Sequence, residues 1–184
     1  LANIKVSLSE GGIGIGAPIG YLPKTNPNEM FQVYKLAGEL QALVFSHVRQ
    51  PDIISIQEAI AVAVLTGAPL HIVHINSMAL GQIQLALDLI KAANQKGFDI
   101  STELYSYTAA STLLQSAMFN EGWQEKLGIS YGDIQWVATG ERLTKATFDA
   151  YRKTGGVAIM HMMKPEWIKT GMSAPGVMIG SDGM

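Results

Sequence analysis

The stretch Leu43-Val-Phe-Ser-His47 decides the fold of this chain, together with its counterpart Leu70-His-Ile-Val-His74. Each is a short apolar run that ends in polar residues, a pattern typical of a buried strand in a parallel sheet. Between the two runs, Ser55 and Glu58 have the spacing of a capping box, and Gly67 supplies a helix end. We therefore expect one helix, ending at about Thr66, to connect the two strands.

The same strand and helix unit recurs along the chain. Further strands are expected at 12–15 and 99–104, and Asn26-Pro27 is the start expected of a helix that runs to about Leu40. Another helix begins near Leu80 and ends at Gly97. Strand starts spaced roughly thirty residues apart predict repeated βα units and a parallel sheet. The sheet is either closed into a barrel or open and doubly wound.

Between Thr108 and Arg152 this rhythm breaks. The segment carries helix-like pieces, a capping candidate at Thr144 and three large aromatic residues, which are Trp123, Tyr131 and Trp136. We interpret it as a long excursion between a strand and a helix, the kind that builds the wall of a site. Two more short strands are expected at 157–160 and 177–180. The chain opens at Leu1 in strand-like sequence and stops directly after a strand, so we expect a segment of a longer domain.

Composition excludes several classes of protein. The chain has 184 residues, 48% of them hydrophobic, and a formal net charge of −2, which argues against disorder. Its 13 Lys and Arg residues form no basic run, so no nucleic-acid partner is expected. The longest apolar runs, such as 59–65, are too short to span a bilayer. Because there is no cysteine, the sequence contains no disulfide and no cysteine ligand for zinc. No signal peptide is visible, which favours a cytoplasmic location.

Three polar residues occupy equivalent positions. His47 and His74 end neighbouring strands, and Asp182 lies just beyond the last strand. The carboxyl ends of parallel strands meet at one edge, so these side chains are expected to converge there. Imidazoles and a carboxylate suit a divalent metal; alternatively, each histidine is a hydrogen-bonded structural residue. His71 is expected on the opposite face with a structural role, and His161 at most behind the site.

The glycines at 12–17 loosely fit the G-x-G-x-x-A pattern of a dinucleotide loop. Pro18 and a loop follow them where that motif requires a helix, and no acidic residue ends the next strand. The pattern therefore favours glycines in a strand, and a doubly wound cofactor-binding protein remains the alternative.

Four segments, in order and spacing, resemble the N-acyl-D-amino-acid deacylases (D-aminoacylases) of the amidohydrolase superfamily. They are Phe45-Ser-His-Val-Arg49, His71-Ile-Val-His-Ile-Asn-Ser77, Thr102-Glu-Leu-Tyr-Ser-Tyr-Thr-Ala-Ala-Ser-Thr112 and Ile179-Gly-Ser-Asp-Gly183. The stretch 129–143 is similar to the N-acyl-D-glutamate deacylase-like subgroup. The resemblance implies an α/β fold, a partial TIM-type (β/α)8 barrel with about strands 4 to 8. Residues 1–184 would then be a single incomplete catalytic domain with an insertion at about 108–156.

The resemblance also implies a role for individual residues. His47 and His74 would be the metal ligands of barrel strands 5 and 6, and Asp182 the strand 8 aspartate that activates water. Tyr105 and Ser111 match family positions near the substrate. Two further residues, Arg49 and Asn76, would meet the substrate, Arg49 through its free carboxylate. The family's His-x-His pair and its early Cys or Glu ligand are absent from this sequence, and the strand 4 segment holds no lysine for a carbamylated bridge.

We therefore expect a zinc enzyme, with one or two divalent ions, that hydrolyses the amide of a small N-acyl-D-amino acid. The alternatives are an amidohydrolase of dipeptides or cyclic amides, and an inactive barrel fragment.

Overall fold

The computed structural model describes residues 1–182 and contains a five-stranded parallel sheet. Neighbouring strands all run in the same direction, with the register of consecutive βα units. In spatial order the strands are β1 (Ile15–Pro18), β2 (Val44–His47), β3 (Leu70–Ile72), β4 (Ile100–Leu104) and β8 (Val177–Ile179).

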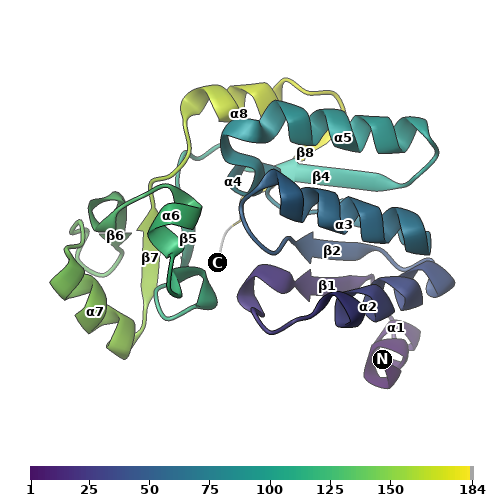
Figure 1. The fold of residues 1–184 in the computed structure, drawn as a ribbon, viewed down its shortest axis with the longest axis horizontal. Helices are drawn as coiled ribbons and strands as arrows, with labels where there is room; N and C mark the ends of the chain where they lie inside the picture. Colours follow the sequence, from purple (N-terminus) through teal and green to yellow (C-terminus); the bar gives the residue numbers. More distant parts are fainter. Residues whose placement is uncertain (183–184) are drawn as a thin grey trace.

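The helices that connect these strands lie side by side on one face of the sheet (Figure 1). They are α2 (Pro27–Leu40), α3 (Ile53–Thr66), α5 (Ile83–Gln95) and α8 (Pro165–Met172), with the short α4 (Ile75–Ala79) and a 3-10 turn, η2 (Leu80–Gln82), leading into α5. A doubly wound sheet carries helices on both faces, whereas a barrel carries them on its outside only. The prediction of a partial barrel is therefore confirmed over the part of the chain that the structure describes.

The two faces of the sheet differ in composition. Residues such as Val44, Leu70 and Ile100 are buried against the helices, where full burial of each large apolar side chain contributes about 1.5–3 kcal/mol. The other face would line the inside of a barrel. One row across it, fixed by the strand register, consists of Gly16, Phe45, His71 and Ser101.

A smaller antiparallel sheet lies beyond the carboxyl ends of the parallel strands (Figure 1). Its order is β5 (Ala110–Leu113), β7 (Val157–Met160) and β6 (Ile134–Trp136). This unit includes α6 (Trp123–Leu127), α7 (Lys145–Thr154) and two 3-10 turns, η3 (Ala117–Phe119) and η4 (Tyr131–Asp133). Its own hydrophobic cluster is built around stacked and edge-on aromatic rings. The break in the βα rhythm after Thr108 thus corresponds to a separate small core. Tyr21, in the turn η1 (Ile19–Tyr21) after β1, joins the two parts through a 3.1 Å hydrogen bond with Thr112.

The N-terminal expectations were wrong in detail. The strand-like opening forms a helix, α1 (Ala2–Ser9), and the strand expected at 12–15 begins only at Ile15. Gly11 and Gly12 end that helix: Gly11 has φ +106°, and the Gly12 amide donates to Ser7 O at 2.9 Å. These glycines therefore form a helix end, which removes the dinucleotide-loop alternative.

The predicted helix caps are confirmed for α2 and α7 and wrong for α3. Asn26 accepts from the Glu29 amide at 2.9 Å, and Thr144 caps α7, as predicted. The capping box at Ser55 and Glu58 was wrong, because Asp52 caps α3 by accepting from the Ser55 amide at 2.7 Å. Asp52, three residues before Ser55, thus accepts the capping hydrogen bond in place of the Ser55 side chain. The Glu58 carboxylate is therefore available to another partner.

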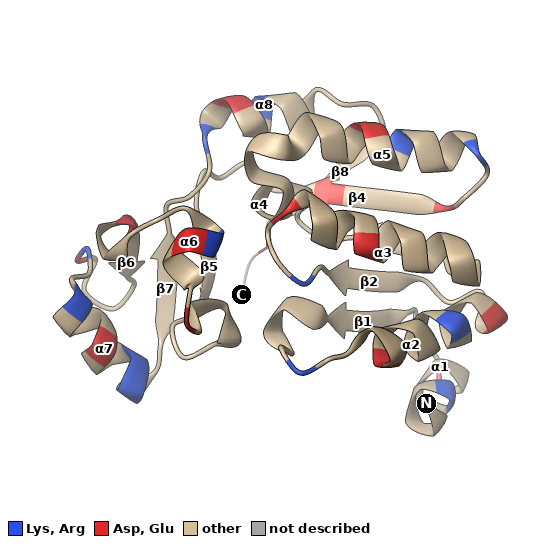
Figure 2. Cartoon of the chain, viewed as in Figure 1, with Lys and Arg blue, Asp and Glu red and all other residues tan. Residues whose placement is uncertain are grey.

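Charged residues are spread over both parts of the molecule; α5, α6, α7 and α8 each carry both signs (Figure 2). Within residues 1–182, no helix has the length and apolar character needed to cross a membrane.

Candidate metal and substrate site

The structure brings His47 and His74 together at the carboxyl edge of the parallel sheet. Their ring centroids are 4.8 Å apart, with the planes close to perpendicular. His47 is the last residue of β2, whereas His74 lies two residues beyond β3, in a left-handed conformation that starts α4. The predicted convergence of residues from neighbouring strands is therefore present.

Hydrogen bonds assign the free nitrogen of each ring. His47 Nδ1 lies 3.0 Å from Val48 O, an acceptor, so this nitrogen carries the proton. His74 Nδ1 lies 2.8 Å from Ser77 Oγ, whose own proton goes to His74 O. Both rings therefore leave Nε2 as the unprotonated nitrogen, which is the form that binds a metal.

Burial keeps both rings neutral. It is the main cause that lowers the pKa of His47 to about 4, and the adjacent His74 lowers that pKa further. Burial also lowers the pKa of His74. Neither ring must therefore lose a proton at neutral pH before it coordinates a cation.

Asp182 shares a small cavity with both histidines. The cavity has a volume of about 20 Å³ and is also lined by Tyr105, Ser77 and Ser111. Partial burial raises the pKa of Asp182, the Glu103 carboxylate raises it further, and His47 opposes the shift. This donor set suits part of a divalent-metal shell. Among the described residues, however, no three His, Asp or Glu side chains form a complete metal-binding group.

Tyr105 follows β4 directly and lines the cavity. Its side chain is buried, and its ring centroid lies 6.4 Å from that of His74. Burial raises the pKa of Tyr105, with Ser77 lowering it and Asp182 raising it. The phenol is therefore a neutral hydrogen-bond donor at the pH values where the histidines are neutral.

A larger cleft of about 910 Å³ opens from this cavity towards the small sheet. The two share Tyr105, Ser111 and Asp182, and Ser111 lies on β5. Most of the remaining wall is apolar or uncharged, including Tyr107, Ala109, Val137, Val157 and Ile159. His161, expected behind the site, lines the cleft itself, and its Nε2 lies 3.0 Å from Gln135 Oε1. With this volume, the cleft is large enough to hold a small molecule beside the histidines.

Asn76, on α4, has no exposed surface and lines neither the small cavity nor the larger cleft. Its Nδ2 donates to Tyr105 O at 3.1 Å and to Met163 Sδ at 3.4 Å. These contacts tie α4 to the segment after β4, so they favour a supporting role for Asn76 over the predicted contact with substrate.

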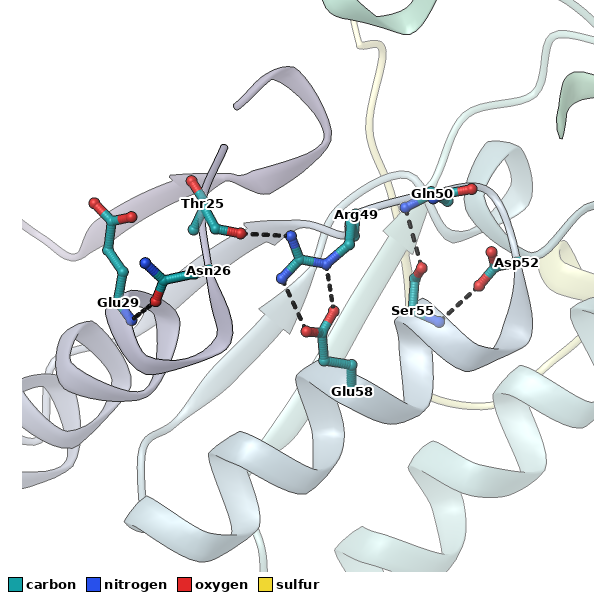
Figure 3. A network of polar contacts seen from close by, with 8 residues as sticks. All are labelled: Thr25, Asn26, Glu29, Arg49, Gln50, Asp52, Ser55 and Glu58. Atoms are coloured by element: carbon teal, nitrogen blue, oxygen red, sulfur yellow. Dashed lines mark hydrogen bonds and ion pairs between the residues drawn. The ribbon is translucent and has the colours of Figure 1, made fainter. Parts of the chain in front are cut away.

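Arg49 also has partners inside the protein (Figure 3). Its Nε and Nη2 each lie 2.9 Å from an oxygen of Glu58, and its Nη1 donates to Thr25 O at 2.8 Å. All three guanidinium nitrogens are therefore engaged, which disfavours the expected pairing with a substrate carboxylate.

Sequence reasoning missed Glu103 and misplaced His71. Both oxygens of Glu103 are engaged: one contacts His71 Nε2, and the other accepts from the His74 amide at 2.7 Å. His71 was expected on the face opposite to His74, but alternation along a strand holds only for extended backbone. Since β3 ends at Ile72 and His74 is left-handed, both histidines contact the same carboxylate. The sequence signal for Glu103 was the presence of an acidic residue within the expected strand, in Ser101-Thr-Glu-Leu104.

Solved structures with the same architecture include N-acyl-D-amino-acid deacylases. The N-acyl-D-glutamate deacylase from Bordetella bronchiseptica, solved with zinc and a phosphonate mimic of the tetrahedral intermediate, superposes with a TM-score of 0.76. The match has 22% identity and covers 94% of this chain and 40% of that enzyme. A D-aminoacylase that defines a subset of the amidohydrolases gives a TM-score of 0.74 and 23% identity over 96% of this chain. This chain has the D-aminoacylase amidohydrolase fold.

The D-aminoacylase match covers 40% of the solved enzyme as well, so this chain spans well under half the length of both structures. Another D-aminoacylase structure, which concerns the role of a binuclear metal centre in that enzyme, matches with a TM-score of 0.74 and 22% identity. No protein-family model and no curated protein matches the sequence.

Proposed function

We propose that this chain carries part of the active site of a metal-dependent amidohydrolase that deacylates N-acyl-D-amino acids. The observation that carries the proposal is the pair of neutral imidazoles at the carboxyl edge of the sheet, each with Nε2 unprotonated, in a D-aminoacylase fold. Two independent structural histidines would not require ring centroids only 4.8 Å apart.

His47 and His74 would hold a divalent metal, zinc in the first instance, as one ion or one of a pair. The metal would supply Lewis acidity that polarises the scissile carbonyl and acidifies water. Val48 O and Ser77 fix the two tautomers, so the ligand nitrogens are oriented before a cation arrives.

In this proposal Asp182 takes a proton from the attacking water and returns it to the departing amine. Its raised pKa makes this carboxylate a stronger base than an exposed aspartate. Tyr105 would donate a hydrogen bond to the substrate oxygen that gains negative charge.

The cleft between the two sheets would hold the acyl group or the amino-acid side chain, with Ser111 near the reacting amide. Its described lining contains no Lys or Arg, and Asp182 is its only Asp or Glu. We therefore propose that neutral, largely apolar groups are preferred at this position over acidic ones.

Zinc content and hydrolysis test the proposal separately. The purified protein would be dialysed with zinc, analysed for bound metal, and assayed with N-acetyl-D-leucine, N-acetyl-L-leucine, N-acetyl-D-glutamate, a dipeptide and a cyclic amide. Retained zinc is the expected result, with hydrolysis of the D-acyl substrates alone and with N-acetyl-D-leucine hydrolysed faster than N-acetyl-D-glutamate. Zinc retention with turnover of only the dipeptide or the cyclic amide would redirect the assignment to those amidohydrolases. Absence of zinc binding would overturn it.

A further inference from the structure

Glu103 connects the barrel interior to the candidate metal site. It lies on β4, beside the row of interior residues that includes His71 and Ser101. One carboxylate oxygen contacts His71 Nε2, and the other accepts from the His74 main-chain N–H at 2.7 Å. A single side chain therefore joins β4 to both ends of the segment between His71 and His74.

The backbone at His74 needs such a contact. Its φ of 33° and ψ of 59° lie in the left-handed region, which residues with a Cβ adopt rarely. This conformation turns the chain out of β3 and into α4, and it accompanies the placement of the imidazole against His47. The hydrogen bond to Glu103 is charge-assisted and holds the N–H of the turned residue.

Glu103 is itself fixed from two sides. His71, which contacts its carboxylate, has its other ring nitrogen 2.8 Å from Ser101 Oγ. Just after β8, a Cβ at Gly180 would lie 3.2 Å from Glu103 Cγ, so the backbone before Asp182 packs closely on this side chain. Burial alone would raise the pKa of Glu103, but the contacts with His71 and the His74 amide outweigh it and lower that pKa.

We propose that Glu103 is a positioning residue for the metal site, with His71 as its anchor. The carboxylate holds His74 in the left-handed turn that accompanies the placement of its imidazole beside that of His47. This inference rests on the proposed function, because it takes His74 as a metal ligand.

The test compares three variants of the purified protein by zinc affinity, measured by competition with a chromophoric chelator. Glu103→Ala removes the acceptor and is expected to weaken zinc binding by about 10- to 100-fold. Glu103→Gln keeps the shape and one oxygen acceptor for the His74 amide, so it should restore most of the affinity. Thr102→Val is the matched control. It changes the neighbouring residue of the same strand and removes the buried 2.7 Å hydrogen bond from Thr102 Oγ1 to Ile72 O. It should leave zinc affinity within about threefold.

Wild-type affinity in Glu103→Ala, or an equal loss in Thr102→Val, would overturn the positioning role while leaving the metal site in place. Hydrogen exchange at the His74 amide supplies a readout that needs no metal. We expect exchange at least tenfold faster in Glu103→Ala and close to wild type in Glu103→Gln. If the wild-type protein bound no zinc, the proposed function would fail, and unchanged exchange at His74 would then refute the role of Glu103 independently. Should Glu103→Ala fail to fold, the same two measurements on His71→Ala decide the matter, because Glu103 loses its anchor there.

Discussion

Arg49 and Glu58 form a bidentate ion pair in which two guanidinium nitrogens each lie 2.9 Å from a carboxylate oxygen. The pair joins the loop after β2 to α3, and a third nitrogen of Arg49 reaches back to Thr25 O (Figure 3). Both side chains are about a quarter exposed. The contacts hold the loop that follows His47 against α3 and the segment at Thr25.

Arg49→Ala is therefore expected to lower the free energy of unfolding by about 1 kcal/mol, a value reduced for the partial exposure of the pair. The KM for N-acyl amino acids should change by less than about threefold, since the cleft has no guanidinium group among its described lining residues. Urea denaturation and steady-state kinetics check the two parts. Lys145→Ala, which breaks an exposed pair with Asp149, is the control and should leave the denaturation midpoint unchanged. A tenfold rise in KM with unchanged stability would restore Arg49 to the substrate site.

The buried phenol of Tyr34 predicts a loss of stability at alkaline pH. Burial raises its pKa to about 12, opposed by Ser46 and assisted by Glu58, whereas the unfolded chain ionises near 10. The buried, neutral phenol makes its full contribution to the free energy of unfolding below pH 10. That contribution is lost as the pH rises through 12, because the phenol of the unfolded chain ionises first. Between pH 9 and 11 the wild type should therefore lose about 1 kcal/mol more than Tyr34→Phe. Parallel pH profiles of the two proteins would contradict this.

The barrel fold could be predicted because the apolar runs at 43–47 and 70–74 specify buried strands whatever surrounds them. The face of the sheet that the helices cover could not be predicted, because it depends on packing between distant segments. The caps show a similar limit. Asp52 and Ser55 are both good cap residues, and only the backbone geometry decides between them.

At the candidate site, residue type and strand position together located His47 and His74. The ion pair of Arg49 was not predicted, because its partner, Glu58, had been assigned to a capping box. Glu103 was missed because it interacts through the backbone conformation of His74, which a strand pattern does not reveal. Residues that contact one another across strands are thus the part of a site that a single sequence specifies least.

Removing either candidate ligand should reduce zinc binding. We expect His47→Ala and His74→Ala each to weaken zinc affinity by more than about a hundredfold, because each removes one of two adjacent imidazole ligands. Equilibrium dialysis followed by elemental analysis gives the stoichiometry. His161→Ala is the matched control, since His161 lines the adjacent cleft but hydrogen-bonds to Gln135. If the control lost as much zinc as the ligand variants, the metal would have to be assigned to another part of the cleft.

Asp182→Asn separates proton transfer from metal binding. The amide keeps the size of the side chain beside His47 and His74 but accepts no proton near neutral pH, so turnover should fall by at least about a thousandfold. Zinc stoichiometry should stay at the wild-type value, because the two imidazoles are unchanged. Single-turnover hydrolysis of N-acetyl-D-leucine and elemental analysis on the same preparation give both quantities. Near-normal kcat would show that Asp182 is not the base. Loss of zinc together with turnover would instead make Asp182 a ligand, placing its carboxylate in the metal shell with the two histidines.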